Sequence, residues 1–237
     1  MIAILDRNSH VIAKLTGLPG VAPVAEALAV LAAAAGNEGG GAAAPHAPVL
    51  MIPRLFEPRL CQDLMDFWEA GDKRRDEVTQ GRGSEVRDNV QSDIKKRADV
   101  IVPEGDNPLH QAILNRFNMR VVPHIEKVFQ YKTSSYDGAR VGCYDAVDGG
   151  YFHAHRDTVS HKQGQERRFA LSLNLNDGFE GGGLRFNENG PALYAPAAGD
   201  GVVFSCKLLH EALPVTKGRR FGLFAFFIEG RGSPGPL

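Results

Sequence analysis

The chain has 237 residues, and its 27 lysines and arginines nearly balance its 28 aspartates and glutamates. That length suits one domain of ordinary size with a small appendage, and the balanced charge gives no electrostatic reason to expect nucleic acid or an anionic membrane as a partner. The three cysteines are far apart and odd in number, which fits neither a disulfide framework nor a zinc motif, so we expect a reducing compartment, namely the cytoplasm.

The beginning of the chain is predicted to hold a small hairpin and one helix. Residues 1–15 contain two short apolar runs around a polar, turn-prone cluster. The segment from Val24 to Ala35 is rich in alanine and is followed by Gly36, a residue type that commonly ends a helix. It is too short to cross a bilayer, so we expect no membrane association.

A low-complexity run at residues 39–45, rich in glycine and alanine, is typical of a flexible linker. We therefore expect two parts, an appendage over residues 1–46 and a main domain over residues 47–237. The appendage is too small to bury a sizeable core of its own.

Helical patterns dominate the first half of the main domain. A short strand is predicted at Val49 to Ile52, before a helix from Glu57 to Gly71 with one apolar stripe. A longer helix is predicted from Asn107 to Gln130, with a kink at Pro123. Apolar residues recur at helical spacing in both segments, which indicates that both helices pack against a core.

Between these helices, residues 72–98 carry a dense mixture of positive and negative charge. Mixed signs with scattered polar residues favour a solvated, irregular loop. The alternative is a lid over a substrate, since lids often have this composition.

From Ala139 onward the pattern changes to short strands and turns. Between Ala170 and Asn176, leucines alternate with serine and asparagine, so this strand should have one face in an apolar core and one in a polar space. Helices followed by many short strands predict an α+β chain whose second half is a β-sandwich or barrel.

One stretch in this half, residues 151–157, places two candidate metal ligands two positions apart. Side chains two apart in a strand point to the same face, so His155 and Asp157 should project together. A distant His210 on a neighbouring strand could complete a set of two histidines and one carboxylate, which binds Fe(II) in non-haem oxygenases. His153 has the same parity, so spacing alone also allows it as a ligand.

A basic residue ten positions beyond His210 extends the pattern. Arg220 begins a strand with apolar neighbours, where a charge needs a partner. Arginine binds carboxylates through two parallel hydrogen bonds, so an anionic, metal-chelating cosubstrate would suit it, and an internal pair with Asp or Glu is the alternative. Strand alternation sends only one of Arg219 and Arg220 inward.

In order and spacing, this set resembles the prolyl 4-hydroxylase-like branch of the Fe(II)/2-oxoglutarate-dependent dioxygenases. The resemblance covers residues 140–228. The matching pieces are Cys143-Tyr144, Gly150-Tyr151, His155-Arg156-Asp157, Leu173-Asn174-Leu175-Asn176, Phe179-Glu180-Gly181-Gly182-Gly183-Leu184-Arg185-Phe186, Gly199-Asp200-Gly201-Val202-Val203-Phe204, His210-Glu211, Pro214-Val215 and Gly218-Arg219-Arg220-Phe221.

The resemblance implies an α+β fold with a double-stranded β-helix (jelly-roll) core and supporting helices packed on one sheet. It implies that Fe(II) is held by His155, Asp157 and His210, and it excludes His153. The presence of Asp157 argues for hydroxylation, because related halogenases lack this carboxylate and leave room for a halide.

The resemblance also implies a binding site for the cosubstrate, 2-oxoglutarate. Arg220, favoured over Arg219 by the family offset, is expected to pair with its distal carboxylate. Tyr144 is expected nearby as a hydrogen-bond donor. Asn174 stands where relatives often have a tyrosine that reaches the distal carboxylate, so we include it as a third candidate.

The implied reaction uses Fe(II), 2-oxoglutarate and O2 to hydroxylate a C–H bond of a prolyl-type peptide residue or of a small molecule, releasing succinate and CO2. Ascorbate is an additional candidate reductant. Two other classes stay open: a cupin-like metalloenzyme that does not use 2-oxoglutarate, and a non-catalytic jelly-roll binding module. The sequence leaves the oligomeric state open.

Overall fold

The computed structural model describes residues 2–5, 11–17, 23–35, 46–80, 87–158 and 166–229. It divides into two compact units, Met1–Ala44 and Pro45–Leu237, and each is described by itself. In the described part of the chain, every helix is too short or too polar to cross a membrane.

The smaller unit consists of a hairpin and one helix, as predicted. β1 (Ile2–Leu5) pairs antiparallel with β2 (Val11–Leu15), and α1 (Val24–Ala35) follows. The predicted turn between the strands, the Gly36 cap and the linker at residues 39–45 lie outside the described residues.

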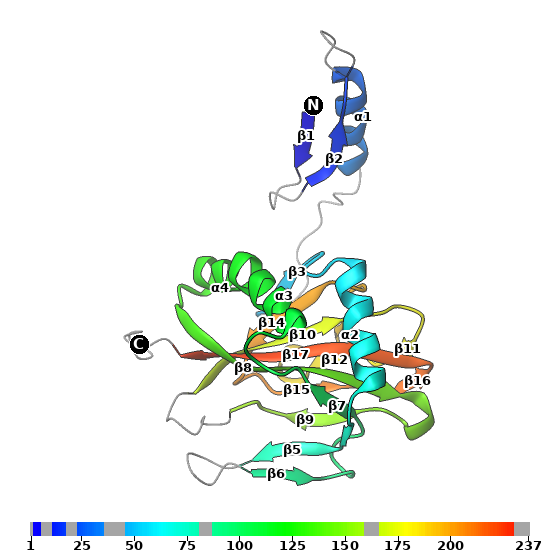
Figure 1. Ribbon diagram of the computed structural model, residues 1–237, viewed down its shortest axis with the longest axis vertical. Coiled ribbons are helices and arrows are strands. Elements are labelled where there is room, and N and C mark those ends of the chain that lie inside the picture. The colour runs from blue at the N-terminus through cyan, green and yellow to red at the C-terminus, as the bar shows by residue number, and fades with distance from the viewer. Residues whose placement is uncertain are drawn as a thin grey trace. The chain divides into compact units, whose positions relative to one another are not determined.

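The larger unit is built around a seven-stranded, largely antiparallel sheet (Figure 1). Its longest strands lie at the centre, where β17 is paired on both sides. The strand order is β3 (Leu50–Ile52), β14 (Gly201–Ser205), β10 (Arg167–Asn174), β17 (Arg219–Glu229), β8 (Thr133–Asp145), β7 (Ala98–Ile101) and β4 (Arg74–Arg75).

A second, four-stranded sheet faces the inner side of the first. A small apolar cluster joins them, with Ala170 and Phe204 from the large sheet against Leu184 and Phe186 from the small one. The order is β13 (Leu193–Tyr194), β12 (Leu184–Phe186), β15 (His210–Ala212) and β9 (Phe152–His155); the further pairs are β11 (Glu180–Gly181) with β16 (Val215–Lys217) and β5 (Glu77–Gln80) with β6 (Arg87–Val90). Two facing antiparallel sheets with supporting helices make the predicted α+β jelly roll.

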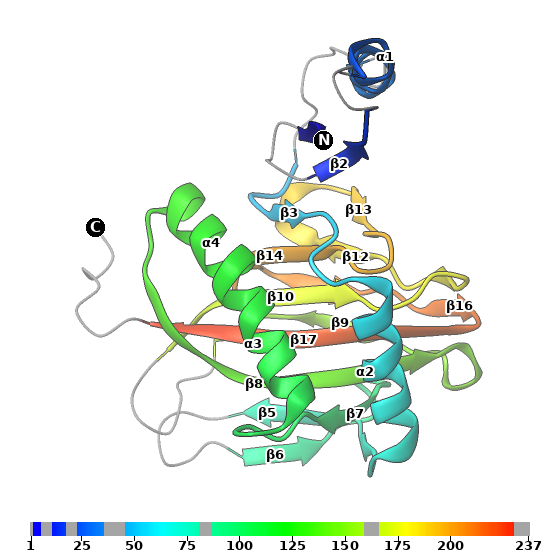
Figure 2. The same ribbon diagram turned by 45° about the horizontal axis from the view of Figure 1, so that its top comes forward.

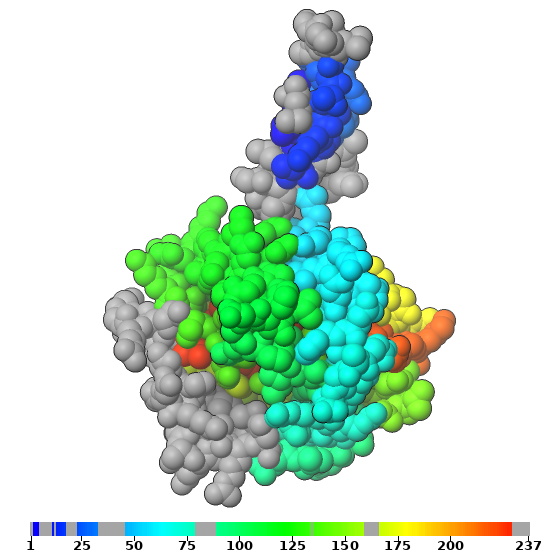
Figure 3. Space-filling model, viewed as in Figure 1, coloured from blue at the N-terminus to red at the C-terminus, as the bar shows by residue number. Residues whose placement is uncertain are grey.

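Helices cover the outer face of the large sheet (Figures 2 and 3). They are α2 (Pro58–Ala70), α3 (Pro108–Arg116) and α4 (Val122–Phe129), the last two joined by a π-helical segment, η2 (Phe117–Val121). The single helix predicted from Asn107 to Gln130 is therefore continuous but irregular. Asn107 caps it by accepting hydrogen bonds from two backbone N–H groups, and Pro123 lies in the first turn of α4.

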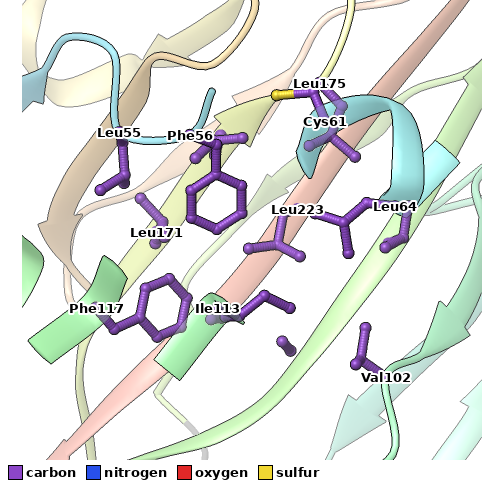
Figure 4. Close-up of a cluster of buried hydrophobic side chains, with 14 of the residues drawn as sticks. Leu55, Phe56, Cys61, Leu64, Val102, Ile113, Phe117, Leu171, Leu175 and Leu223 are labelled. Atoms are coloured by element: carbon purple, nitrogen blue, oxygen red, sulfur yellow. The ribbon is translucent and has the colours of Figure 1, made fainter. Parts of the chain in front are cut away.

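The main core lies between these helices and the large sheet (Figure 4). Leu64 of α2, Ile113 of α3 and Leu223 of β17 are all fully buried there. On β10, Leu171 and Leu173 also face this core, whereas Ser172 lines a cavity on the other side. The predicted alternation of the strand is confirmed, and it fixes which side chains reach the space between the sheets.

The expectation of an irregular, solvated segment at residues 72–98 is wrong for most of its described part. It contains β4, β5 and β6, and its last residues, Lys95 and Arg97, are buried. Phe152 of β9 bridges to Lys95, so this segment extends the edge of the small sheet. Residues 81–86 lie outside the described part.

Two single-turn 3₁₀ helices, Ala146–Asp148 and Asn187–Asn189, connect strands of the larger unit. The first begins at Asp145, whose carboxylate accepts a hydrogen bond from the N–H of Val147. It turns the chain from β8 toward β9 and so leads from one sheet to the other.

Candidate active site

Three potential metal ligands from neighbouring strands meet between the sheets. His155 ends β9 and lies opposite His210, the first residue of β15. Asp157 follows β9, and its backbone N–H donates to the carbonyl of Cys206. The Asp157 carboxylate lies 3.6 Å from His155 Nε2 and 3.3 Å from His210 Nε2. One ligand atom from each of the three residues lies within 4.8 Å of the others.

Hydrogen bonds on the far side of each imidazole fix its orientation. Nδ1 of His155 lies 2.7 Å from the carbonyl oxygen of His153, and Nδ1 of His210 lies 3.0 Å from that of Leu208. Because a carbonyl only accepts, each Nδ1 donates a proton to it, which leaves Nε2, the nitrogen turned toward Asp157, as the atom that can ligate a metal. Two such nitrogens and one carboxylate oxygen are the donor set of non-haem Fe(II) sites, so these residues fit that metal.

A β-bulge explains why His153 is not part of this cluster. His155 pairs with His210, but the next pair is Phe152 with Ala212, so His153 and Ala154 together oppose Glu211. The extra residue reverses the parity, and Phe152 stacks on His155 with ring centroids 3.6 Å apart. His153 is exposed and stacks on Tyr151 instead.

The ionisation of the cluster suits a metal site. Burial lowers the pKa of His155 to about 4. Burial disfavours the charge on Asp157 as well, but His210 holds the pKa of this carboxyl well below its usual range. Burial also opposes a proton on His210, yet Asp157 raises the pKa of this imidazole above its ordinary value. A divalent cation would replace that proton, since a ligating imidazole must be neutral.

A buried guanidinium, Arg220, lies on the wall of the same cavity. It is 2 % exposed, whereas Arg219 is exposed and pairs with Glu69 at 2.9 Å. Among the described residues, Arg220 has no carboxylate within ion-pair distance; its donors reach Asn174 Oδ1 at 2.9 Å, the Gly182 carbonyl at 2.9 Å and Ser172 Oγ at 3.3 Å. An anion that entered the cavity would therefore meet a preorganised, uncompensated charge.

Asn174 lies behind Arg220 and does not line the cavity. Its Oδ1 accepts from Arg220 Nε, and its Nδ2 donates to the carbonyl of Pro196 at 2.6 Å. Both ends of the amide are thus engaged within the protein. The predicted contact of Asn174 with 2-oxoglutarate stays a prediction, and its observed contact is with the guanidinium.

Tyr144 lines the cavity beside Arg220 and is held from behind by Arg97. The Tyr144 hydroxyl accepts a hydrogen bond from Arg97 Nη1 at 3.1 Å. Arg97 is itself clamped by Asp99, which accepts from its Nε at 2.6 Å and its Nη2 at 2.9 Å. Because the hydroxyl oxygen accepts from Arg97, its own proton is available to a group in the cavity.

The cavity connects these groups. It has a volume of about 50 Å³, with the three candidate ligands at one side and apolar rings from β17 and β14 among its walls. It is lined by Arg97, Tyr144, Phe152, His155, Asp157, Ala170, Leu171, Ser172, Leu184, Phe204, His210, Ala212, Arg220, Phe224 and Phe226. A mostly apolar pocket with a few convergent polar groups is the usual form of a small-molecule site.

Comparison with known proteins identifies the family. Residues 139–228, which include the three candidate ligands and Arg220, match the family model of the 2OG-Fe(II) oxygenase superfamily, where 2OG is 2-oxoglutarate. Over these residues the chain has the sequence pattern of this superfamily. The oxygenase accordingly uses Fe(II), 2-oxoglutarate and O2. A comparison with curated proteins found no match.

Solved structures share the fold of the oxygenase at low sequence identity. A prolyl-4-hydroxylase from Pseudomonas putida is 18 % identical with a TM-score of 0.58, over 77 % of this chain and 93 % of that one. A viral collagen prolyl hydroxylase from Paramecium bursaria Chlorella virus-1 is 14 % identical with a TM-score of 0.56, over 77 % and 96 %. A Trichoplax adhaerens prolyl hydroxylase, in complex with a hypoxia inducible factor peptide, is 14 % identical with a TM-score of 0.57, over 76 % and 83 %.

Sequence reasoning missed several residues of the oxygenase cavity. Arg97 falls in the segment 72–98, which is predicted as a solvated loop or a lid, and its partner Asp99 has no predicted role, although Val100, Ile101 and Val102 follow directly. That apolar run is the signal of a buried strand and could have placed the pair inside. The aromatic rings of Phe224 and Phe226 lie on a strand that is apolar on both faces, so the sequence does not separate the cavity side from the core side.

Proposed function

We propose that this oxygenase hydroxylates an unactivated C–H bond of a prolyl-type peptide residue or of a small molecule, with conversion of 2-oxoglutarate to succinate and CO2. The observation that carries the proposal is the meeting of three ligand atoms within 4.8 Å in one cavity with Arg220, which has no carboxylate partner in the described chain. When bound, Fe(II) supplies the oxidising chemistry with O2, and the protein binds, orients and shields the reactants.

In this proposal, His155, Asp157 and His210 hold Fe(II) and leave the remaining positions to the cosubstrate and O2. The intact carboxylate of Asp157 favours hydroxylation over halogenation, because it occupies the position that a halide would need. The stacked ring of Phe152 keeps His155 in place and excludes water from one side of the cluster.

Arg220 binds the distal carboxylate of 2-oxoglutarate. Asn174 and the Gly182 carbonyl each accept one of its hydrogen bonds and so fix the plane of the guanidinium. Tyr144 donates its hydroxyl proton to the same carboxylate, while Arg97 holds the phenol in place. Such charge-assisted contacts give both affinity and orientation.

The choice of substrate draws on weaker support. The prolyl hydroxylases that share the fold favour a peptide residue, and the Trichoplax structure contains a peptide. The cavity, mostly apolar with a few convergent polar groups, is also of the kind that binds a small molecule. We expect neither nucleic acid nor a membrane as partner, and we place the protein in the cytoplasm because Cys61, Cys143 and Cys206 are all unpaired and buried.

Two other functions are less well supported. A cupin-like metalloenzyme without 2-oxoglutarate would have no use for the buried Arg220, which is costly to keep without an anion. A non-catalytic binding module would have no need for two imidazoles with their Nε2 atoms turned to a single carboxylate.

The proposal is tested by anaerobic titration of the Fe(II)-loaded protein with 2-oxoglutarate. Chelation of iron by the cosubstrate should produce a metal-to-ligand charge-transfer band in the green region of the spectrum. Arg220→Ala should weaken 2-oxoglutarate binding by at least about 30-fold, because a buried charge pair is lost, and His210→Ala should abolish the band.

Arg219→Ala is the matched control, since Arg219 is the exposed neighbour that pairs with Glu69. It should leave the band and the affinity unchanged. Unchanged 2-oxoglutarate affinity in Arg220→Ala would show that another group binds the distal carboxylate.

A further inference from the structure

A second arginine, Arg140, points into the inner side of the large sheet and has no role in the site described above. On β8 it lies two residues before Gly142 and four before Tyr144, so the three share one face of the strand. In the register with β17, Tyr144 lies opposite Arg220 and Arg140 lies opposite Phe224. Tyr144, Arg220 and Phe224 line the cavity, so Arg140 lies on the same face of the sheet, just beyond the residues that line it.

Arg140 has no polar partner among the residues that the structure describes. Its Nε is buried without a hydrogen bond, and no hydrogen bond or ion pair joins its guanidinium to any described residue. The centre of the Phe226 ring lies 5.8 Å from its guanidinium carbon. Phe226 is itself a wall of the cavity.

The carboxylates nearest to Arg140 already have cationic partners. Asp99 accepts from Lys95 Nζ at 2.8 Å and from two nitrogens of Arg97. Asp137 accepts from Arg167 Nε at 2.7 Å, and Arg167 stacks on Phe226 at 3.9 Å. Three cations thus share two carboxylates, and Arg140 adds a fourth positive charge.

Such an excess of buried positive charge lowers stability unless an anion joins it. Burial lowers the pKa of Arg140 from its ordinary value, which reports the same cost. Arginine nevertheless stays protonated at neutral pH. The charge is therefore present, and Asp99 and Asp137 act on it only from beyond ion-pair distance.

The backbone positions of the two arginines are further apart than the cosubstrate is long. On the paired strands β8 and β17, the pair Gly142–Gly222 lies between the pair Arg140–Phe224 and the pair Tyr144–Arg220. Arg140 and Arg220 are therefore four residues apart along the strand direction. Four residues of strand span about 13 Å. A five-carbon dicarboxylate, with bonds of about 1.5 Å, covers roughly half of that distance.

We propose that Arg140 binds a carboxylate of the primary substrate just beyond the cavity, on the same face of the large sheet as Arg220 and further along the strands. The substrate is then an anionic molecule whose carboxylate lies near the reacting carbon, either a free α-carboxylate or an acidic side chain next to the target residue in a peptide. This inference rests on the proposed function, since it assigns the substrate class of the same cavity.

The experiment measures binding without turnover. Protein loaded with redox-inert Zn(II) and saturated with 2-oxoglutarate is titrated calorimetrically with two pairs of probes. One pair is a five-residue alanine peptide with a central proline and either glutamate or glutamine beside it. The other pair is N-acetyl-L-proline and its amide. The variants are Arg140→Met and Arg140→Lys, with Arg59→Met, an exposed arginine of α2, as the matched control.

At least one acidic probe should bind about ten-fold or more tightly than its neutral partner in the unaltered protein. The preference should fall below about three-fold in Arg140→Met, persist in part in Arg140→Lys and stay intact in Arg59→Met. A preference in the peptide pair identifies an acidic side chain as the source, and one in the proline pair identifies a free carboxylate.

Absence of an acidic preference in both pairs would overturn the proposal, as would weaker 2-oxoglutarate binding by Arg140→Met with probe binding unchanged. Loss of thermal stability in Arg140→Met would also contradict it, because removing a half-buried cation whose Nε has no partner should not lower Tm. These readouts differ from the charge-transfer band, so failure of the substrate class and failure of the proposed function are distinguishable.

Discussion

Asp99 determines how the cationic side chains behind the cavity are arranged. It accepts two hydrogen bonds from Arg97 and one from Lys95, and all three residues are buried. The bidentate geometry favours Arg97 in the competition for this carboxylate. Arg97 in turn fixes the Tyr144 hydroxyl, so one carboxylate outside the cavity positions a donor inside it.

This arrangement disfavours the protonated form of Lys95 in the folded protein. The free energy of unfolding should therefore depend on pH. Burial and the neighbouring Arg97 lower the pKa of Lys95 to about 8, although Asp99 acts in the opposite direction. Between about pH 8 and the ordinary lysine value near 10.5, the unfolded chain binds the proton more strongly than the folded chain. The contribution of Lys95 to stability is therefore lowest below pH 8 and should rise, by up to about 3 kcal/mol, as the pH is raised through this window.

This rise is measured as the difference between the unaltered protein and Lys95→Met, by urea unfolding at pH 7.5 and at pH 10. Lys95→Met should lack the rise, whereas Lys217→Met, at an exposed lysine paired with Glu180, should keep it. Parallel pH dependence in all three proteins would mean that Lys95 keeps its proton when folded.

At the level of single residues, the sequence predicted the candidate metal ligands and the candidate carboxylate-binding arginine. His155, Asp157 and His210 converge, and alternation along β17 places Arg220 inside and Arg219 outside. Their iron and cosubstrate contacts stay predictions. What the sequence could not predict is a group whose position depends on tertiary charge pairing, as the burial of Arg97 depends on Asp99.

At the level of elements, irregularities in the strands orient the site. The bulge in β9 turns Phe152 toward His155 and His153 away from it. Parity alone treats His153 and His155 alike, so this distinction needs the register with β15, which a single sequence does not contain. Similarly, the π-helical turn between α3 and α4 was predicted as a proline kink, and it depends on packing of Phe117 and Val121 in the core.

Because Gly142 of β8 has no side chain, the ion pair between Asp99 and Arg97 can lie directly against the strand at this position. A Cβ at this position would lie 2.5 Å from Asp99 Oδ1 and 2.9 Å from Arg97 Nε. Gly142→Ala should therefore displace the ion pair, lower the free energy of unfolding by about 1–3 kcal/mol, and weaken 2-oxoglutarate binding through Tyr144.

Chemical unfolding and the charge-transfer titration measure the two effects of Gly142→Ala. Gly183→Ala is the control for stability, because its nearest contact would be Leu193 Cβ at 3.4 Å and its backbone conformation is ordinary. If both alanine variants were equally stable, the ion pair would have room to move.

At the level of the whole molecule, the two faces of the large sheet have different roles. The outer face packs against the helices, and the inner face lines the cavity. Leu171 and Leu223 hold the helices on the outer face, while Ser172 and Arg220 face the cavity. The order of elements predicted an α+β chain whose second half is a β-sandwich or barrel, and the resemblance implied the jelly roll. The seven-strand order was beyond the sequence, since it brings β3, far from β14 in the chain, to the sheet edge.

The boundary between the two units makes the last prediction. Residues 45–237 form one compact unit, and its first ordered contacts include the buried Ala47, whose N–H donates to Tyr194 Oη at 2.7 Å. We therefore expect a chain that begins at Pro45 to fold, to show the charge-transfer band and to keep Tm within about 3 °C of the full chain.

A chain that begins at Pro53 is the matched control, because it lacks Ala47 and β3, including the fully buried Ile52 that pairs with Gly201. Loss of an edge strand and of a core side chain should cost several kcal/mol, which lowers Tm by about 10 °C or more. Both chains are compared by calorimetry and by 2-oxoglutarate titration. If the chain from Pro45 lost the band while the full chain kept it, the site would depend on the first 44 residues, and the division into an appendage and an independent catalytic domain would be wrong.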